Sequence, residues 1–84
     1  MIKEKVGQRI KELRTKLGLS QEEFAFKCDL DRTYITSLER GKRNPSLMIL
    51  NKIAIALKID MSELLKGIQD FSYEDIVLKM SSIR

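Results

Sequence analysis

The feature of the sequence that most constrains its fold is a series of helix start signals, which recur at intervals of 11 to 15 residues. Ser20, Asp31, Ser46 and Asp60 each stand just before a segment with helical apolar spacing, where an N-cap side chain can accept a backbone N–H. Ser20 and Glu23 also have the spacing of a capping box. Helices that begin so close together must be short and joined by short connections.

Together with an apolar stripe that runs from Ile2 to Leu17, these signals predict an all-α fold. The five expected helices cover residues 2–17, 21–28, 32–40, 47–57 and 61–67. Connections of roughly two to six residues are typical of helices packed as a compact bundle, and the sequence shows no β alternation. We therefore expect a compact five-helix bundle.

The chain of 84 residues is expected to form one domain over residues 1–67, followed by a tail over residues 68–84. In the tail, Ile76, Val77 and Met80 have a spacing that allows a sixth amphipathic helix. The alternative is a frayed terminus. Both interpretations remain open.

Composition excludes several classes of protein. The sequence has no histidine and a single cysteine, Cys28, so it has no His-ligated metal site, no intramolecular disulfide and no Cys-rich zinc site. No paired carboxylates or nucleophile–base set can be assembled, so we expect no enzyme, no metal and no cofactor. No apolar run approaches the roughly 18 residues that cross a bilayer, and the first residues are already charged. We expect a cytoplasmic protein with no membrane segment.

The charge is distributed unevenly along the chain. Residues 1–43 carry 11 basic and 7 acidic side chains, whereas residues 44–84 carry five of each. The basic excess therefore lies entirely in the first half. This asymmetry indicates a polyanionic partner, which is either nucleic acid or an anionic membrane surface.

The expected helices over residues 21–28 and 32–40 are joined by three residues, which is the geometry of a helix-turn-helix. The segments 17–25 (LGLSQEEFA) and 34–46 (YITSLERGKRNPS) resemble the Cro/lambda-repressor-like helix-turn-helix family. Through residues 30–35 (LDRTYI) and the basic loop, the chain is similar above all to controller proteins of restriction–modification systems. Asp29 stands where the family has glycine, and aspartate tolerates the positive φ of that turn better than most residues.

The resemblance implies a sequence-specific transcriptional regulator that binds double-stranded DNA as a homodimer on a palindromic operator. A controller protein acts on its own gene and on that of a restriction endonuclease. The alternatives are a phage or plasmid repressor or an antitoxin of the same fold, and a protein-interaction adaptor that does not bind DNA. The operator sequence, activation against repression, and assembly of dimers into a tetramer on DNA remain open.

The predicted base contacts lie at the start of the helix over residues 32–40, the part of a recognition helix that meets base edges in the major groove. They are Arg32, Thr33, Tyr34 and Ser37, to which the controller resemblance adds Arg43. Arg32 can donate two hydrogen bonds to guanine, and the Thr33 methyl can contact a thymine methyl. The alternatives are a solvated charge for Arg32 and a packing role for Tyr34.

The predicted phosphate contacts are Gln21, Thr36, Lys42 and Asn44. Gln21 begins a helix whose free backbone N–H groups favour an anion. The loop after the recognition helix is of the kind that contacts phosphates and sets the register of the protein on the duplex.

Other prominent residues are assigned to structure. The family pattern implies that Arg14 and Glu39 form a buried ion pair that fixes the recognition helix. Phe24, Phe26 and Cys28 are expected in or near the core.

The helix over residues 47–57 contains only two polar residues, so it should have two apolar faces. One face, from Leu47 to Leu57, is expected in the core. Met48 and Ile55 lie on a second stripe, which we interpret as a homodimer interface. In the alternative interpretation, the C-terminal tail covers this stripe.

Overall fold

The computed structural model describes residues 1–70, which contain five α-helices and no strands. The helices are α1 (Ile2–Lys16), α2 (Gln21–Cys28), α3 (Arg32–Glu39), α4 (Leu47–Leu57) and α5 (Met61–Leu64). The expected all-α fold of five helices is thereby confirmed. The proposed sixth helix falls on residues outside the described part of the chain.

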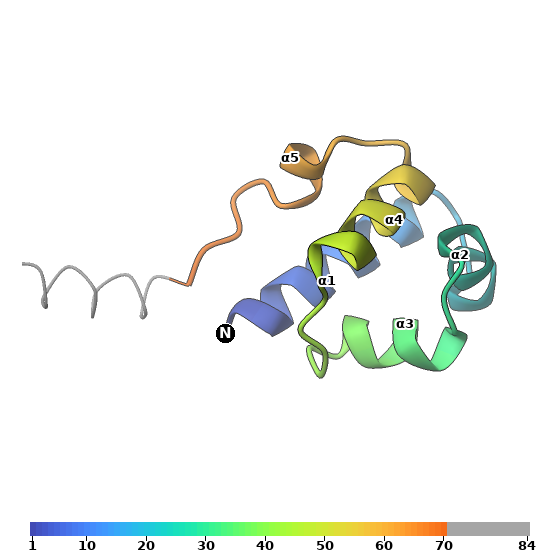
Figure 1. Ribbon diagram of the computed structural model, residues 1–84, viewed down its shortest axis with the longest axis horizontal. Helices are drawn as coiled ribbons and strands as arrows, with labels where there is room; N and C mark the ends of the chain where they lie inside the picture. The colour runs from blue at the N-terminus through green and yellow to red at the C-terminus, as the bar shows by residue number, and fades with distance from the viewer. Residues whose placement is uncertain (71–84) are drawn as a thin grey trace, which may run out of the picture.

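The arrangement of the helices leaves one side of α3 uncovered. Helix α3 packs against α1 and α2, while α4 packs against α2 and α5. Figure 1 shows α3 along the lower edge of the domain, on the opposite side from α5. One face of α3 therefore belongs to the core and the other faces outward.

The helix start signals act as the sequence predicts at two of the four positions. The Ser20 hydroxyl accepts the Glu23 backbone N–H at 3.0 Å, and the Glu23 carboxylate accepts the Ser20 N–H at 2.8 Å. The hydrogen bond from the Ser20 backbone lowers the pKa of Glu23. At the start of α4 the Ser46 hydroxyl accepts the Ile49 backbone N–H at 3.2 Å, whereas Asp31 and Asp60 occupy N-cap positions without a side-chain cap hydrogen bond.

The turn between α2 and α3 is formed by a non-glycine residue. Asp29 adopts the left-handed region with φ 56° and ψ 47°, and the next backbone N–H, that of Leu30, bonds to the Ala25 carbonyl at 2.9 Å. Aspartate reaches this region at lower cost than most side chains. The connection between α2 and α3 is thus the three residues expected for a helix-turn-helix.

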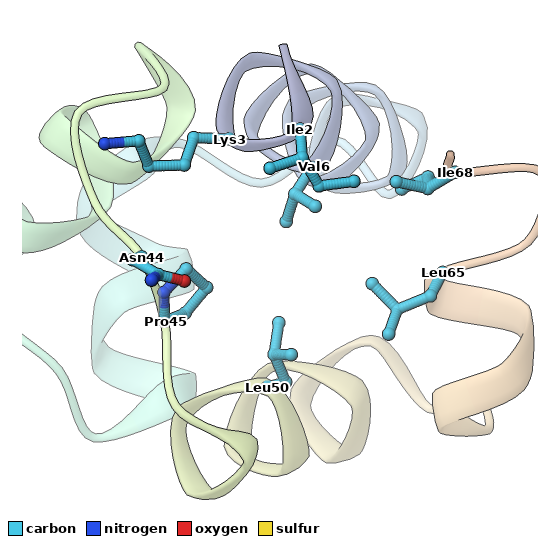
Figure 2. A pocket seen from close by; sticks show the side chains of 8 residues that line it. All are labelled: Ile2, Lys3, Val6, Asn44, Pro45, Leu50, Leu65 and Ile68. Carbon is cyan, nitrogen blue, oxygen red and sulfur yellow. The ribbon is translucent and has the colours of Figure 1, made fainter. Parts of the chain in front are cut away.

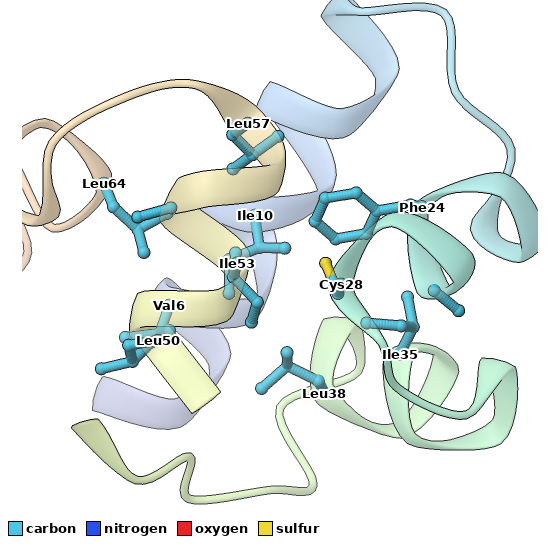
Figure 3. Close-up of a cluster of buried hydrophobic side chains, with 12 residues drawn as sticks. Val6, Ile10, Phe24, Cys28, Ile35, Leu38, Leu50, Ile53, Leu57 and Leu64 are labelled. Atoms are coloured by element: carbon cyan, nitrogen blue, oxygen red, sulfur yellow. The ribbon is translucent and has the colours of Figure 1, made fainter. Parts of the chain in front are cut away.

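The core is built from side chains that all four longer helices contribute (Figure 3). Phe24, Ile35 and Leu38 are completely buried at the meeting of α2 and α3. Cys28 lies beside them, and its burial raises the pKa of the thiol to about 11. The thiol therefore stays protonated near neutral pH and packs as a small apolar group.

Two residues expected in the core are exposed, and both predictions were wrong. Phe26 is 88% exposed because α2 buries Phe24, and a residue two positions further along a helix points to nearly the opposite side. Leu47 is 74% exposed because it is the first residue of α4, before the helix reaches the core.

The close approach of α1 to α3 depends on Gly7. A Cβ atom on this residue would overlap the Leu38 carbonyl oxygen and would lie 2.9 Å from the Glu39 carbonyl oxygen. Gly7 itself is buried. The absence of a side chain at this position lets the backbone of α1 support the C-terminal turn of α3.

Candidate nucleic-acid interface

The outward face of α3, together with the chain that follows it, forms one open depression. The residues that line it are Arg32, Thr33, Thr36, Ser37, Arg40 and Lys42. The three basic side chains are exposed and, within residues 1–70, have no ion-pair partner. The structure therefore presents three cations and the hydroxyl groups of Thr33 and Ser37 on one face that is open to an external ligand.

Arg40 belongs to this face, although it is not among the residues predicted from the sequence to contact DNA. It follows Thr36 by four residues and Arg32 by eight, which is the spacing of one helical stripe. Helical periodicity applied to the predicted base contacts would have found it.

Tyr34 and Arg43 are brought together beside this depression. The Arg43 guanidinium lies over the Tyr34 ring, 5.3 Å from its centroid. A cation–π contact at such a site contributes about 0.5–1 kcal/mol. Tyr34 is half-buried and packs against the core, which is the packing role that the sequence offered as the alternative, and its base contact stays a prediction.

Arg14 and Glu39 form an ion pair between α1 and the last residue of α3. Arg14 Nε donates to Glu39 Oε2 at 2.6 Å, and Arg14 Nη2 donates to Glu39 Oε1 at 2.9 Å. Their side chains are only 8% and 3% exposed. Arg14 Nη1 also donates to the Leu19 carbonyl at 2.7 Å, so the pair connects α1, the start of α2 and α3.

Gln21 and Thr36, both predicted to contact phosphate, are hydrogen-bonded to each other across α2 and α3. The Thr36 hydroxyl donates to Gln21 Oε1 at 2.9 Å, and Gln21 Nε2 donates to Glu39 Oε1 at 3.0 Å. Both side chains are half-buried. They extend the buried ion pair toward the outward face of α3.

Asn44 lines a different cavity from the other predicted contacts. It lies with Pro45 at the edge of an apolar pocket of about 250 Å³, into which Val6, Leu50 and Leu65 point (Figure 2). Lys42, two residues earlier, lines the depression on α3. In the loop after α3, Lys42 therefore belongs to the depression on α3 and Asn44 to the apolar pocket.

On α4, the predicted second stripe is exposed. Met48 and Ile55 are 75% and 67% exposed, and Leu47 extends this apolar surface at the start of the helix. Lys52 lies between them on the same stripe, with its ammonium group 3.8 Å from the Asp29 carboxylate. Large apolar side chains gathered on one face of a small domain are typical of an interface.

Two other kinds of site are absent from the described part of the chain. Residues 1–70 contain no group of three or more histidine, cysteine, aspartate or glutamate side chains placed to hold a metal ion. No helix among them has the length and apolarity to span a bilayer.

Comparison with known proteins supports this description. The family model described as helix-turn-helix matches residues 10–64. The control protein C.MunI from a Mycoplasma species is 52% identical over 69 residues, which are 81% of this chain and 93% of the relative. The control protein C.BamHI from Bacillus amyloliquefaciens is 48% identical over 60 residues, which are 70% of this chain and 74% of the relative.

A solved structure has the same fold. The crystal structure of the restriction-modification controller protein C.AhdI from Aeromonas hydrophila matches with a TM-score of 0.71 and 54% identity. The match covers 73% of this chain and 92% of that chain. The resemblance stated from residues 17–25 and 34–46 is thereby confirmed.

Proposed function

This chain belongs to the helix-turn-helix family, and we propose that it is the controller protein of a restriction–modification system, binding a palindromic DNA operator as a homodimer. Two curated relatives and one solved structure, each at least 48% identical, carry the name of control or controller protein. These names favour a controller over the repressor, antitoxin and adaptor alternatives. The proposed activity is binding rather than catalysis.

The observation that carries the proposal is the outward face of α3. Arg32, Arg40 and Lys42 line one depression there, while the opposite face of the same helix is fixed by the ion pair between Arg14 and Glu39. The major groove of DNA admits an α-helix and presents hydrogen-bond acceptors between two rows of phosphates. A rigidly held helix with a cationic, hydroxyl-bearing face fits that groove.

The proposal gives the residues of this face two kinds of role. Base edges are assigned to Arg32, Thr33, Tyr34, Ser37 and Arg43. Phosphates are assigned to Gln21, Lys42 and Asn44, with Arg40 added from its place in the depression. Base contacts specify the sequence, whereas phosphate contacts set the register.

The proposed dimer places Met48 and Ile55 of α4 against the same surface of a second copy. A two-fold axis through that interface would present the two α3 helices to half-sites about one helical turn apart. Where two operators adjoin, two dimers would form a tetramer on the DNA. A regulator of genes acts where the DNA is, so the proposal places the protein in the cytoplasm.

DNA binding is expected to weaken steeply as salt rises. If each subunit makes four to five phosphate contacts, a dimer displaces counterions from roughly 8–10 phosphates, so the slope of log K against log salt should be of order −7 to −9. The measurement is a fluorescence anisotropy titration of a duplex that the protein has selected from a random-sequence pool. Lys42→Ala should make the slope shallower by about one per subunit, whereas Lys11→Ala on the exposed side of α1 should leave it unchanged. A slope near zero would exclude nucleic acid as the ligand.

Arg32 and Gln21 are expected to affect DNA binding differently, because Arg32 is assigned to a base and Gln21 to a phosphate. Arg32→Ala should cost about 1–3 kcal/mol per half-site and flatten the preference at one symmetric base position. Gln21→Ala should weaken binding to every sequence by a similar factor and leave the order of preference unchanged. The test measures both variants against all single-base changes in one half-site. A uniform loss for Arg32→Ala, with altered base preference for Gln21→Ala, would mean that α3 does not read the groove as proposed.

A further inference from the structure

We infer that Thr36 is a positioning residue, which orients the Gln21 side chain for a DNA phosphate and makes no phosphate contact of its own. The inference rests on the proposed function, since it concerns how the same surface holds DNA. It also replaces the direct phosphate contact that the sequence assigned to Thr36.

The Gln21 amide is held at both ends. Its Oε1 accepts the Thr36 hydroxyl at 2.9 Å, and its Nε2 donates to Glu39 Oε1 at 3.0 Å. Rotation of the amide by a half-turn would place its oxygen against the Glu39 carboxylate, where two acceptors would face each other. Glu39 is itself fixed by two hydrogen bonds from Arg14. The position of the Gln21 amide is therefore set from α1 and from α3.

One N–H of Gln21 is left over by this arrangement. A primary amide carries two donor hydrogens, and the contact with Glu39 uses one of them. The second is available to an external acceptor beside the N-terminus of α2, where the helix dipole favours negative charge. A phosphate oxygen is an acceptor of this kind.

The Thr36 hydroxyl, in contrast, has no donor to spare. It carries a single hydrogen, which lies between two acceptors: Gln21 Oε1 at 2.9 Å and the Arg32 carbonyl at 3.1 Å. Phosphate oxygens only accept hydrogen bonds, so the lone pairs that Thr36 retains cannot bind them. Of this pair of side chains, Gln21 is the one equipped to bind phosphate.

A double-mutant cycle separates positioning from direct contact. Thr36→Val keeps the shape of the side chain and removes the hydroxyl. It should lower DNA affinity by about 2- to 12-fold per subunit, the change that the loss of one hydrogen bond produces. In protein that already carries Gln21→Ala, the same change should have no further effect. Thr36→Ser retains the hydroxyl and should bind like the unmodified protein.

The affinities are measured on the selected duplex and on a random-sequence duplex, because a phosphate contact affects both alike. Thr15→Val is the matched control, since the Thr15 hydroxyl also bonds the carbonyl four residues earlier but, among residues 1–70, forms no hydrogen bond to another helix. The NMR relaxation of the Gln21 side-chain amide in the free protein gives a readout without DNA. That amide should become more mobile in Thr36→Val and remain ordered in Thr36→Ser.

The results of the cycle distinguish a positioning role of Thr36 from a direct phosphate contact. Equal losses of affinity for Thr36→Val with and without Gln21 would show a direct contact and overturn the inference. No loss of affinity in either background would also overturn it, because Thr36 would then have no role in DNA binding. If Thr36→Val fails to fold, Thr36→Ala takes its place in the same cycle. Unmodified protein that binds neither duplex would overturn the proposed function as well. Failure of the cycle alone, with normal binding by the unmodified protein, would overturn only the role of Thr36.

Discussion

Replacement of Glu39 by alanine is expected to lower the free energy of unfolding by about 3–5 kcal/mol. The change would leave the Arg14 guanidinium, whose side chain is 8% exposed, with the Leu19 carbonyl as its remaining hydrogen-bond partner. A buried charge without its counter-ion retains its desolvation cost and loses the attraction that offset it. Urea denaturation followed by circular dichroism measures the effect.

Glu63→Ala provides the matched control. Glu63 also pairs with an arginine of α1, at 2.9 Å from Arg9, but the two side chains are 24% and 49% exposed. Exposed pairs of this kind contribute about 0–1 kcal/mol, because water screens them. Similar losses of stability for Glu39→Ala and Glu63→Ala would contradict the burial that the structure assigns to Arg14 and Glu39.

The same carboxylate connects stability with DNA binding. Glu39 accepts hydrogen bonds from both Arg14 and Gln21, so its removal also frees one end of the Gln21 amide. We therefore expect the folded fraction of Glu39→Ala to bind DNA less tightly than the unmodified protein. Glu63→Ala should not weaken DNA binding. Its partner Arg9 also donates to carbonyl oxygens of α5, so Arg9 stays bonded to that helix when the carboxylate is removed.

The helices could be predicted from the sequence because their signals are local. Ser20 and Glu23 fix the start of α2, and Ser46 fixes the start of α4, through hydrogen bonds between residues three apart. The left-handed turn at Asp29 was expected from the resemblance instead, because the family has glycine at this position and aspartate tolerates that region better than most residues. The bounds of α2 and α4 are those expected from the sequence.

Features that depend on packing could not be predicted in this way. Phe26 and Leu47 are large and apolar, but whether they are buried depends on which face of α2 or α4 meets a neighbouring helix. Gly7 carries no pattern of its own, and its role appears only when α1 lies against the carbonyl groups at the end of α3.

Within the candidate site, residue types could be predicted more readily than partners. The basic and hydroxyl residues after Asp31 indicated a DNA-facing helix, and their contacts with bases and phosphates stay predictions. The bond between Gln21 and Thr36 joins residues 15 positions apart on two helices, so only the tertiary arrangement reveals it. It changes the role of Thr36 without changing the chemistry of the surface.

Replacement of Ile55 by glutamate is expected to abolish dimerisation and, with it, tight operator binding. In the proposed dimer, each copy would bring a carboxylate into a surface formed with Met48, where it loses hydration. The cation on the same stripe, Lys52, already lies 3.8 Å from the Asp29 carboxylate. The dimer dissociation constant should rise by at least about 100-fold. A monomer presents a single α3 to one half-site and loses the benefit of two linked binding events. Sedimentation velocity and operator titration measure the two effects.

Leu17→Glu is the control for this experiment. Leu17 is also apolar and exposed, at 55%, but it lies at the C-terminal end of α1 rather than on the α4 stripe. Both variants should keep the helical circular dichroism of the unmodified protein, because each site already faces solvent in the monomer. Ile55→Glu alone should sediment as a monomer and bind weakly. If the unmodified protein is itself monomeric at high micromolar concentration, or if Ile55→Glu remains dimeric, then α4 does not form the interface.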